Sequence, residues 1–217
     1  MRSSESVVKL NRMSVFMGFF HVLDNFTVRP PEYRCMKLVI GITGASGVSY
    51  GIRLLEVLQH RADTYLIITS AARQIIEIES EIDVQAVEAL ATSVLDEHDF
   101  RAPIASGSHL FDGMVIVPCS MKTLGSVANG ISDTLVTRTA DVCLKEGRTL
   151  ILVPRETPLS LIHIENMLRA KRAGAVILPA CPGFYQKPET IEDLIEIIVG
   201  RILDLIGIRH ELYERWD

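Results

Sequence analysis

Residues suited to binding a phosphate follow five short apolar segments of the chain. They are small residues, hydroxyl-bearing residues and cations, and they occur in Gly44-Ala45-Ser46-Gly47, Thr69-Ser70, Cys119-Ser120-Met121-Lys122-Thr123, Arg155-Glu156-Thr157 and Gly183-Phe184-Tyr185. Where a helix begins, free backbone N–H groups and the positive end of the helix dipole attract phosphate. If each stretch leads from a strand toward a helix, these residues predict a site for a phosphorylated ligand.

Arg155 and Glu156 place opposite charges side by side directly after one of these apolar segments. A carboxylate in that place could accept a proton from a bound substrate. The alternative is a capping arrangement in which Pro158 lies in the first turn of the next helix. Both interpretations can hold together, so Glu156 is a candidate general base.

Arg201 interrupts a segment, residues 191–208, that is apolar around most of a helical circumference. A helix so apolar is expected to be buried, in the core or against another subunit, and a buried guanidinium needs an anionic partner. Phosphate is the partner that we favour. The alternative is that the side chain extends to a carboxylate on the nearby surface.

A second pair of cations, Arg138 and Lys145, shares one predicted helical face with Asp141. Faces of this kind are usually solvated and carry local ion pairs, and spacing alone favours that interpretation. Cys119 has no partner that would activate it as a nucleophile, which favours a small buried residue.

Two common site types are disfavoured by the sequence. The glycines at 41, 44, 47 and 51 do not spell G-x-G-x-x-G, and Thr69 stands where an NAD-binding protein would carry an acidic residue. The four cysteines include no C-x-x-C pair, which argues against a zinc or redox site and favours a reducing compartment.

Five apolar segments, rich in Val, Ile and Leu, are typical of buried strands: residues 37–43, 64–69, 113–118, 149–154 and 173–179. Segments of helical period separate them, at residues 48–60, 71–79, 83–91, 120–129, 133–147 and 158–173. This alternation predicts an α/β fold of three layers (αβα), with a doubly wound parallel sheet in flavodoxin-like or Rossmann-like order. Such sheets bind ligands beyond the carboxyl ends of their strands.

Length, net charge and the N-terminal segment exclude several classes of protein. The 217 residues suit one domain, and the net charge of −5 would repel nucleic acid and anionic membrane surfaces. Residues 13–23 form an apolar patch that is too short to span a bilayer, and no small-x-small cleavage site follows it. We therefore expect a cytoplasmic protein in which residues 1–35 are a poorly ordered arm or an upstream-start artefact and residues 36–217 form the ligand-binding domain.

The chain resembles the UbiX flavin prenyltransferases and the closely related small subunits of phenolic acid decarboxylases. The resemblance covers residues 36–217 and rests on several long motifs: GITGASGVSYGIRLLEVL, ASGS at residues 105–108, VPCSMKTL, RTADVCLKEGRTLILVPRETPLSLIHIENML and PGFYQKP. It implies an FMN-binding flavoprotein domain that is usually assembled as a homododecamer.

The activity implied by this resemblance joins a dimethylallyl group, from dimethylallyl phosphate, to the N5 and C6 atoms of reduced FMN. FMN is then a substrate, and the product, prenylated FMN, serves a UbiD-type decarboxylase. The sequence has no Asp-Asp pair or DDxxD motif to hold magnesium, so we expect a metal-independent reaction. Two other functions remain open: a subunit that carries FMN to a decarboxylase, and a flavin-dependent decarboxylase that acts directly on an aromatic acid.

The resemblance also implies roles for individual residues. Contacts to FMN are implied for Gly44, Ala45, Ser46, Thr69, Ser120, Met121, Lys122, Thr123 and Arg155. Lys145, Tyr185 and Arg201 would hold the prenyl phosphate. The catalytic residues would be Ser46, Glu79, Arg138, Lys145 and Glu156. Glu79 is not singled out by its spacing, and Ser70 stands where a lysine is common in the family.

Overall fold

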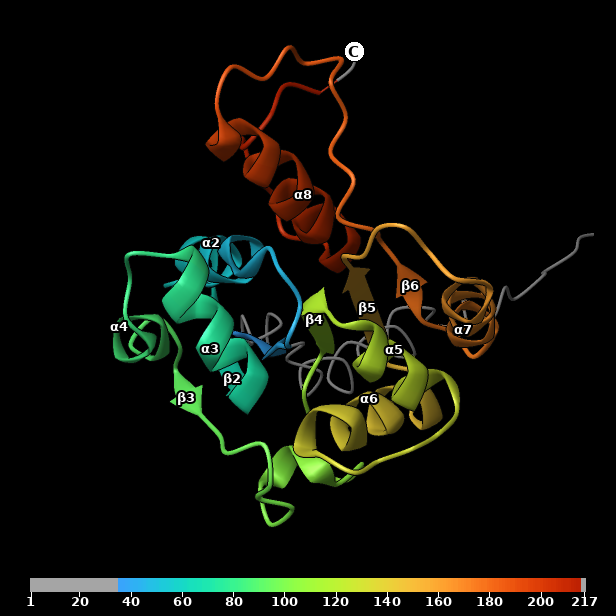
Figure 1. Cartoon of the computed structure of the whole chain (residues 1–217). Helices are drawn as coiled ribbons and strands as arrows, with labels where there is room; N and C mark the ends of the chain where they lie inside the picture. The colour runs from blue at the N-terminus through green and yellow to red at the C-terminus, as the bar shows by residue number, and fades with distance from the viewer. Residues whose placement is uncertain (1–34, 216–217) are drawn as a thin grey trace, which may run out of the picture. The chain divides into compact units, whose positions relative to one another are not determined.

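One parallel sheet forms the centre of residues 35–215, the part of the chain that the computed structural model describes (Figure 1). Its six strands are β1 (Met36–Ile42), β2 (Ala62–Ile68), β3 (Ser93–Val94), β4 (Gly113–Cys119), β5 (Thr149–Pro154) and β6 (Val176–Ile177). They lie in the order β3-β2-β1-β4-β5-β6. Apart from Cys35, the predicted leader at residues 1–35 falls outside the described residues.

The strand order confirms the predicted doubly wound sheet. The described part of the chain enters the sheet at its centre with β1, adds β2 on one side and β4 on the other, and so creates a switch point between β1 and β4. The five predicted strands alone have the flavodoxin-like order. The sixth, β3, pairs with β2 through only two residues at the edge and extends the order to the Rossmann-like one.

Helices cover both faces of the sheet, as the three-layer prediction requires. They are α2 (Val48–Leu58), α3 (Ser70–Glu79), α4 (Val84–Glu88), α5 (Met121–Ala128), α6 (Leu135–Lys145), α7 (Leu161–Arg172) and α8 (Ile191–Ile206). Alternate residues of β1 point to opposite faces. Leu38 and Ile40 belong to a buried cluster with α2, α3 and α8, and Val39 belongs to a second cluster with α5 and α6.

The last predicted strand is the one that differs most from expectation. Of residues 173–179, only Val176 and Ile177 form a strand, which pairs with Ile151 and Leu152 of β5. Leu178 N still donates a hydrogen bond to the carbonyl oxygen of Leu152, at 2.9 Å, but the chain then leaves the sheet without regular pairing. Because β6 lies at the edge of the sheet, it pairs with β5 alone. The apolar segment is therefore longer than the part of it that forms strand pairs.

Gly51 lets α2 pack very close to the central strand β4. A Cβ atom at this position would lie 2.5 Å from the carbonyl oxygen of Val117 and 3.1 Å from Cδ1 of Ile42. Only a glycine leaves space for that strand backbone. The contact helps to fix the start of α2 relative to the carboxyl end of β4, where the next section places a cavity.

Candidate functional site

A cavity of about 590 Å³ lies at the carboxyl ends of β1, β2 and β4. This volume falls within the usual range for sites that bind small molecules. The residues that line the cavity include seven of the predicted site residues: Gly44, Thr69, Ser120, Met121, Lys122, Thr123 and Glu156. Residues from four loops that are distant in sequence therefore face one space beside the switch point of the sheet.

Hydroxyl groups cap two of the helices that begin at the cavity, α3 and α5. Thr69 precedes α3, and its Oγ1 accepts a hydrogen bond from Ala72 N at 3.2 Å. Ser120 precedes α5, and its Oγ accepts one from Thr123 N, also at 3.2 Å. Such capping hydrogen bonds satisfy N–H groups that have no partner within the helix. The two hydroxyls thus place the positive ends of two helix dipoles at the cavity.

Thr43 joins the loops that carry these caps. Its Oγ1 donates a hydrogen bond to the carbonyl oxygen of Pro118 and accepts one from Ser120 N, both at 2.8 Å. On the other side of β1, Thr69 N donates to the carbonyl oxygen of Ile42 at 3.0 Å. The ends of β1, β2 and β4 are therefore linked by hydrogen bonds, which hold the backbone beside the cavity in place.

The loop after β1 is held from outside the cavity by two predicted site residues. Glu79 accepts hydrogen bonds on Oε2 from Gly47 N at 2.8 Å and from Val48 N at 3.4 Å. Arg155 Nε donates to the carbonyl oxygen of Ser46 at 3.1 Å. Glu79 supplies a carboxylate at the start of α2, where Gly47 itself makes no side-chain cap. The structure thus gives Glu79 a local role that its position in the sequence does not reveal.

Arg138 and Lys145 lie on α6 and do not line the cavity. Arg138 Nη1 pairs with Asp141 at 3.1 Å, and its Nε donates to the carbonyl oxygen of Ala105 at 3.0 Å. Lys145 Nζ lies 3.6 Å from Glu146 Oε1. Within one chain these contacts match the local ion pairs that spacing alone favours, and the catalytic roles implied for both residues remain predictions.

Arg201 is not buried in the core of the single chain, so the first of its two predicted environments is wrong and burial against another subunit stays a prediction. Its side chain is 51% exposed, and its Nη1 pairs with Asp204 at 3.1 Å. Ile198 and Ile202 of α8 are buried in the core, whereas Arg201 lies at the edge of this buried face and reaches solvent. Tyr185 is exposed as well. Neither Arg201 nor Tyr185 lines the cavity that holds the other candidates.

Comparison with known proteins places this chain in a family. A model of the flavoprotein family matches residues 29–203. The flavin prenyltransferase UbiX of Methanocaldococcus jannaschii is 50% identical over 181 residues, which cover 83% of this chain and 98% of that protein. The mitochondrial flavin prenyltransferase of Saccharomyces cerevisiae is 47% identical over 189 residues, covering 87% of this chain and 77% of that protein. The chain belongs to the UbiX family of flavin prenyltransferases.

Solved structures of UbiX relatives have the same fold. AnUbiX, in complex with FMN and dimethylallyl pyrophosphate, is 48% identical with a TM-score of 0.83 and covers 85% of this chain and 98% of its own. A dodecameric FMN-dependent UbiX-like decarboxylase from Escherichia coli O157:H7 is 46% identical with a TM-score of 0.82, covering 84% and 100%. The cysteine decarboxylase TvaF, at 16% identity and a TM-score of 0.57, shares the fold alone.

The cavity of this UbiX-family chain suits FMN by its volume and by the chemistry of its lining. Gly44 lets the loop after β1 approach α3 closely, because a Cβ there would lie 2.6 Å from Cβ of Ala71. Two helix amino ends and Lys122 supply attraction for a phosphate, and several threonine and serine hydroxyls can bind a sugar-like chain. These groups would hold the flavin that the family binds.

Several cavity residues were not found by sequence reasoning. They are Ala71, Glu97, His98, Ser126, Thr134 and Thr137. Glu97 accepts hydrogen bonds on Oε1 from both the backbone N–H and the hydroxyl of Ser70. Thr134 and Thr137 form a capping box at the start of α6. That capping pattern was readable, whereas Glu97 and His98 lie in a segment without helical or strand period.

The thiol of Cys119 is not a nucleophile in this site. Cys119 is buried, and its burial raises the pKa of the thiol to about 12. Only the thiolate is reactive, and it is scarcely populated near neutral pH.

Among residues 35–215, no group of three or more His, Cys, Asp or Glu side chains could hold a metal ion.

Proposed function

We propose that this chain joins a dimethylallyl group to reduced FMN and releases prenylated FMN. The observation that supports this most directly is the cavity that brings Gly44, Thr69, Glu156 and residues 120–123 together at the switch point of the sheet. Helix amino ends and hydroxyls there suit a flavin phosphate and its ribityl chain. The choice of reaction rests on membership of the UbiX family of flavin prenyltransferases.

The chain's own residues would bind both reactants and remove a proton. Breaking the allylic carbon–oxygen bond leaves the phosphate with the bonding electrons, and Lys145, Arg201 and Tyr185 would stabilise that charge. The prenyl group bonds first to the flavin N5 atom, which loses its proton. Ring closure then adds a proton to the prenyl double bond, joins its tertiary carbon to the neighbouring aromatic carbon and removes the proton of that aromatic carbon. Glu156, which lines the cavity, would accept it, or the released phosphate would.

The donor that we propose is dimethylallyl phosphate. AnUbiX was crystallised with dimethylallyl pyrophosphate, so the two donors must be compared directly. A diphosphate commonly needs magnesium held by an Asp-rich motif, which this sequence lacks. We therefore expect transfer from the monophosphate without added metal.

The mass of the released flavin tests this function. We expect that anaerobic incubation of the protein with reduced FMN and dimethylallyl phosphate yields a flavin heavier by one prenyl unit. Unchanged FMN with both the monophosphate and the pyrophosphate would refute transfer and support a subunit that carries FMN. Release of carbon dioxide from an aromatic acid, with unchanged flavin, would support the decarboxylase activity that the E. coli relative's name describes.

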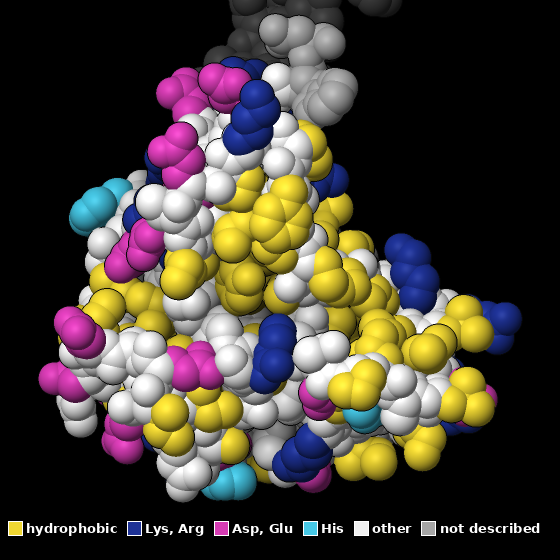
Figure 2. Space-filling view, turned by 45° about the horizontal axis from the view of Figure 1, so that its top comes forward, with side chains coloured by type: hydrophobic (Ala, Val, Ile, Leu, Met, Phe, Trp, Pro, Cys, Tyr) yellow, Lys and Arg dark blue, Asp and Glu magenta, His cyan; other side chains and the backbone are white. Residues whose placement is uncertain are grey.

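We propose that copies of this chain assemble through the apolar face of α7, defined by Leu161, Ile162, Ile164 and Leu168. All four side chains are exposed in the single chain. Figure 2 shows hydrophobic side chains gathered on the side of the molecule where α7 lies in Figure 1. Such a patch is unusual on a monomer and marks an interaction surface. Assembly would also allow Lys145, Tyr185 and Arg201 to reach a cavity of a neighbouring copy.

Replacing Ile162 with glutamate should break this assembly. We expect the wild-type protein to sediment as a dodecamer and Ile162→Glu to sediment as smaller species, because a charge in an apolar interface is costly to bury. The control is Ile78→Glu, which makes the same change at an isoleucine of α3 that is 80% exposed. The α7 interface is refuted if both variants sediment like the wild type, and the assembly itself if the wild type is a monomer.

The product would be used by a UbiD-type decarboxylase, and we propose that the chain acts in the cytoplasm. Within residues 35–215, no helix combines the length and the hydropathy that crossing a bilayer demands. The two exposed cysteines, Cys35 and Cys181, are free, as are the buried Cys119 and Cys143. Free thiols are typical of a reducing compartment.

A further inference from the structure

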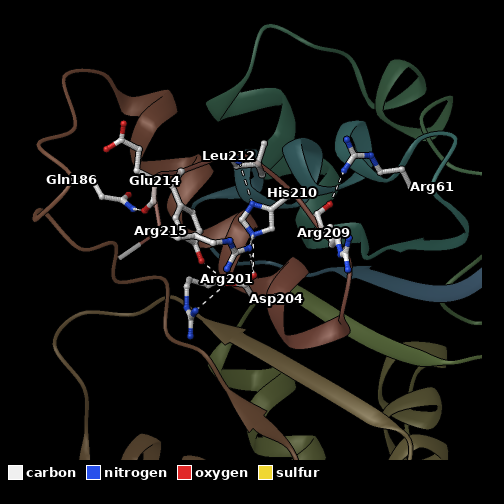
Figure 3. Close-up of polar contacts among 10 residues, drawn as sticks. Arg61, Gln186, Arg201, Asp204, Arg209, His210, Leu212, Glu214 and Arg215 are labelled. Carbon is white, nitrogen blue, oxygen red and sulfur yellow. Dashed lines mark hydrogen bonds and ion pairs between the residues drawn. The ribbon is translucent and has the colours of Figure 1, made fainter. Parts of the chain in front are cut away.

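The carboxylate of Asp204 is the centre of a polar cluster on α8. Four side chains reach it, and Figure 3 shows Arg201, His210 and Arg215 converging on it. The contacts divide between its two oxygens. Oδ2 accepts hydrogen bonds from Arg201 Nη1, at 3.1 Å, and from the Tyr213 hydroxyl. Oδ1 accepts one from Arg215 Nη2, at 2.6 Å, and lies 3.1 Å from His210 Nε2.

Close packing keeps this cluster in one geometry. The His210 side chain is only 1% exposed, and its ring meets that of Tyr213 edge-on at 5.0 Å. A Cβ atom at Gly200 would overlap Tyr213 and lie 2.7 Å from His210 Cε1. Glycine at this position therefore lets the chain after α8 fold back against the helix, and Asp204 binds the returning segment.

The charge of Asp204 is stable near neutral pH. Burial alone would raise the pKa of its carboxyl group, but hydrogen bonds from Arg215 and Tyr213 outweigh burial and hold the pKa at about 2. The side chain is 18% exposed, so water screens these contacts only partly. One carboxylate then lies between two guanidinium groups, which leaves the cluster with net positive charge.

Arg201 is held at one end and open at the other. Its Nη1 is fixed on Asp204, while half of the side chain remains exposed. An arginine side chain loses considerable rotamer freedom when it binds a ligand, and a contact that fixes it beforehand reduces that loss. An anion that approaches Arg201 therefore meets a guanidinium that is already oriented.

We propose that Asp204 is the positioning residue for Arg201 and thereby sets the affinity of the enzyme for the phosphate of the prenyl donor. This inference rests on the proposed function, in which Arg201 binds that phosphate. Asp204 itself touches neither reactant. Asp204 orients the guanidinium of Arg201 through Oδ2, the oxygen that also accepts the hydrogen bond from the Tyr213 hydroxyl.

The test compares two variants that affect different oxygens of the cluster. Asp204→Asn removes the charge that holds Arg201, and we expect the KM for dimethylallyl phosphate to rise about tenfold. Arg215→Ala removes a contact to Oδ1 and leaves the Arg201 contact in place, so the same KM should stay within about twofold. The dissociation constant of FMN should stay within about twofold in both variants, because neither residue lines the flavin cavity.

A double-mutant cycle separates positioning from a merely structural role. In an Arg201→Lys background, Asp204→Asn should change the donor KM by less than about twofold, because the guanidinium that it orients is gone. If Asp204→Asn does not fold, Asp204→Glu moves the charge by one methylene and should also raise the donor KM. An equal rise of KM in Arg215→Ala, or an undiminished effect of Asp204→Asn in the Lys background, would overturn the inference. Failure of the wild type to prenylate FMN would instead refute the proposed function.

Discussion

Replacing Arg201 with alanine should abolish prenyl transfer and leave FMN bound. We expect kcat/KM for dimethylallyl phosphate to fall at least about a thousandfold, or about 4 kcal/mol, because the leaving phosphate loses a cation. The dissociation constant of FMN should change less than about twofold, since Arg201 does not line the flavin cavity. Anaerobic kinetics and flavin titration measure the two quantities separately.

The fold should tolerate this change, which makes the result interpretable. Without Arg201, Asp204 keeps contacts with His210, Tyr213 and Arg215. The matched control is Arg101→Ala, which removes another arginine whose partner is a nearby carboxylate, Asp99 at 3.0 Å. We expect wild-type transfer in that variant. A loss of FMN binding as large as the loss of transfer in Arg201→Ala would show that Arg201 serves the flavin instead of the donor.

Replacing Gly51 with alanine should cause the largest loss of stability among single-methyl changes on α2. The new Cβ would lie 2.5 Å from the carbonyl oxygen of Val117, and a backbone atom of a central strand cannot move away easily. Overpacking of this kind outweighs the better helix propensity of alanine. We expect the free energy of unfolding to fall by about 2 kcal/mol, measured by denaturant titration at fixed protein concentration.

Gly125 offers the matched control, because it is also a glycine within a helix. A Cβ there would meet only the amide nitrogen of Asn166, at 3.4 Å. Gly125→Ala should therefore leave the free energy of unfolding unchanged or raise it by up to about 1 kcal/mol through helix propensity. If both alanine variants are equally stable, the close contact between α2 and β4 does not constrain the fold as described.

The sequence was sufficient for the four inner strands of the sheet, because most of their residues are buried. Continuous apolar segments mark β1, β2, β4 and β5 within one or two residues of their observed ends. The short strand β3 could not be found in this way, since Ser93 and Val94 are neither an apolar run nor fully buried. A strand this short is defined by its pairing with the neighbouring strand, and the local sequence carries no information about that neighbour.

The site could be predicted only where it follows the strand ends. The loops after β1, β2, β4 and β5 contribute most of the predicted residues that line the cavity, because strand order alone brings them together. Glu97 reaches the cavity from a segment without period and contacts Ser70, a pairing that depends on tertiary structure. Arg201 is exposed in the single chain, which the sequence could not show because an apolar count does not tell whether a single cation of α8 faces the core or solvent.

The two edge strands of the sheet, β3 and β6, have only two residues each. A long bare rim would expose rows of unpaired N–H and C=O groups, which invite another chain to add a strand and so seed aggregation. Rims this short offer almost no template for strand addition. Copies of the chain that associate would therefore meet through side chains on their helices, as in the α7 interface proposed above, and would not grow by adding strand to strand.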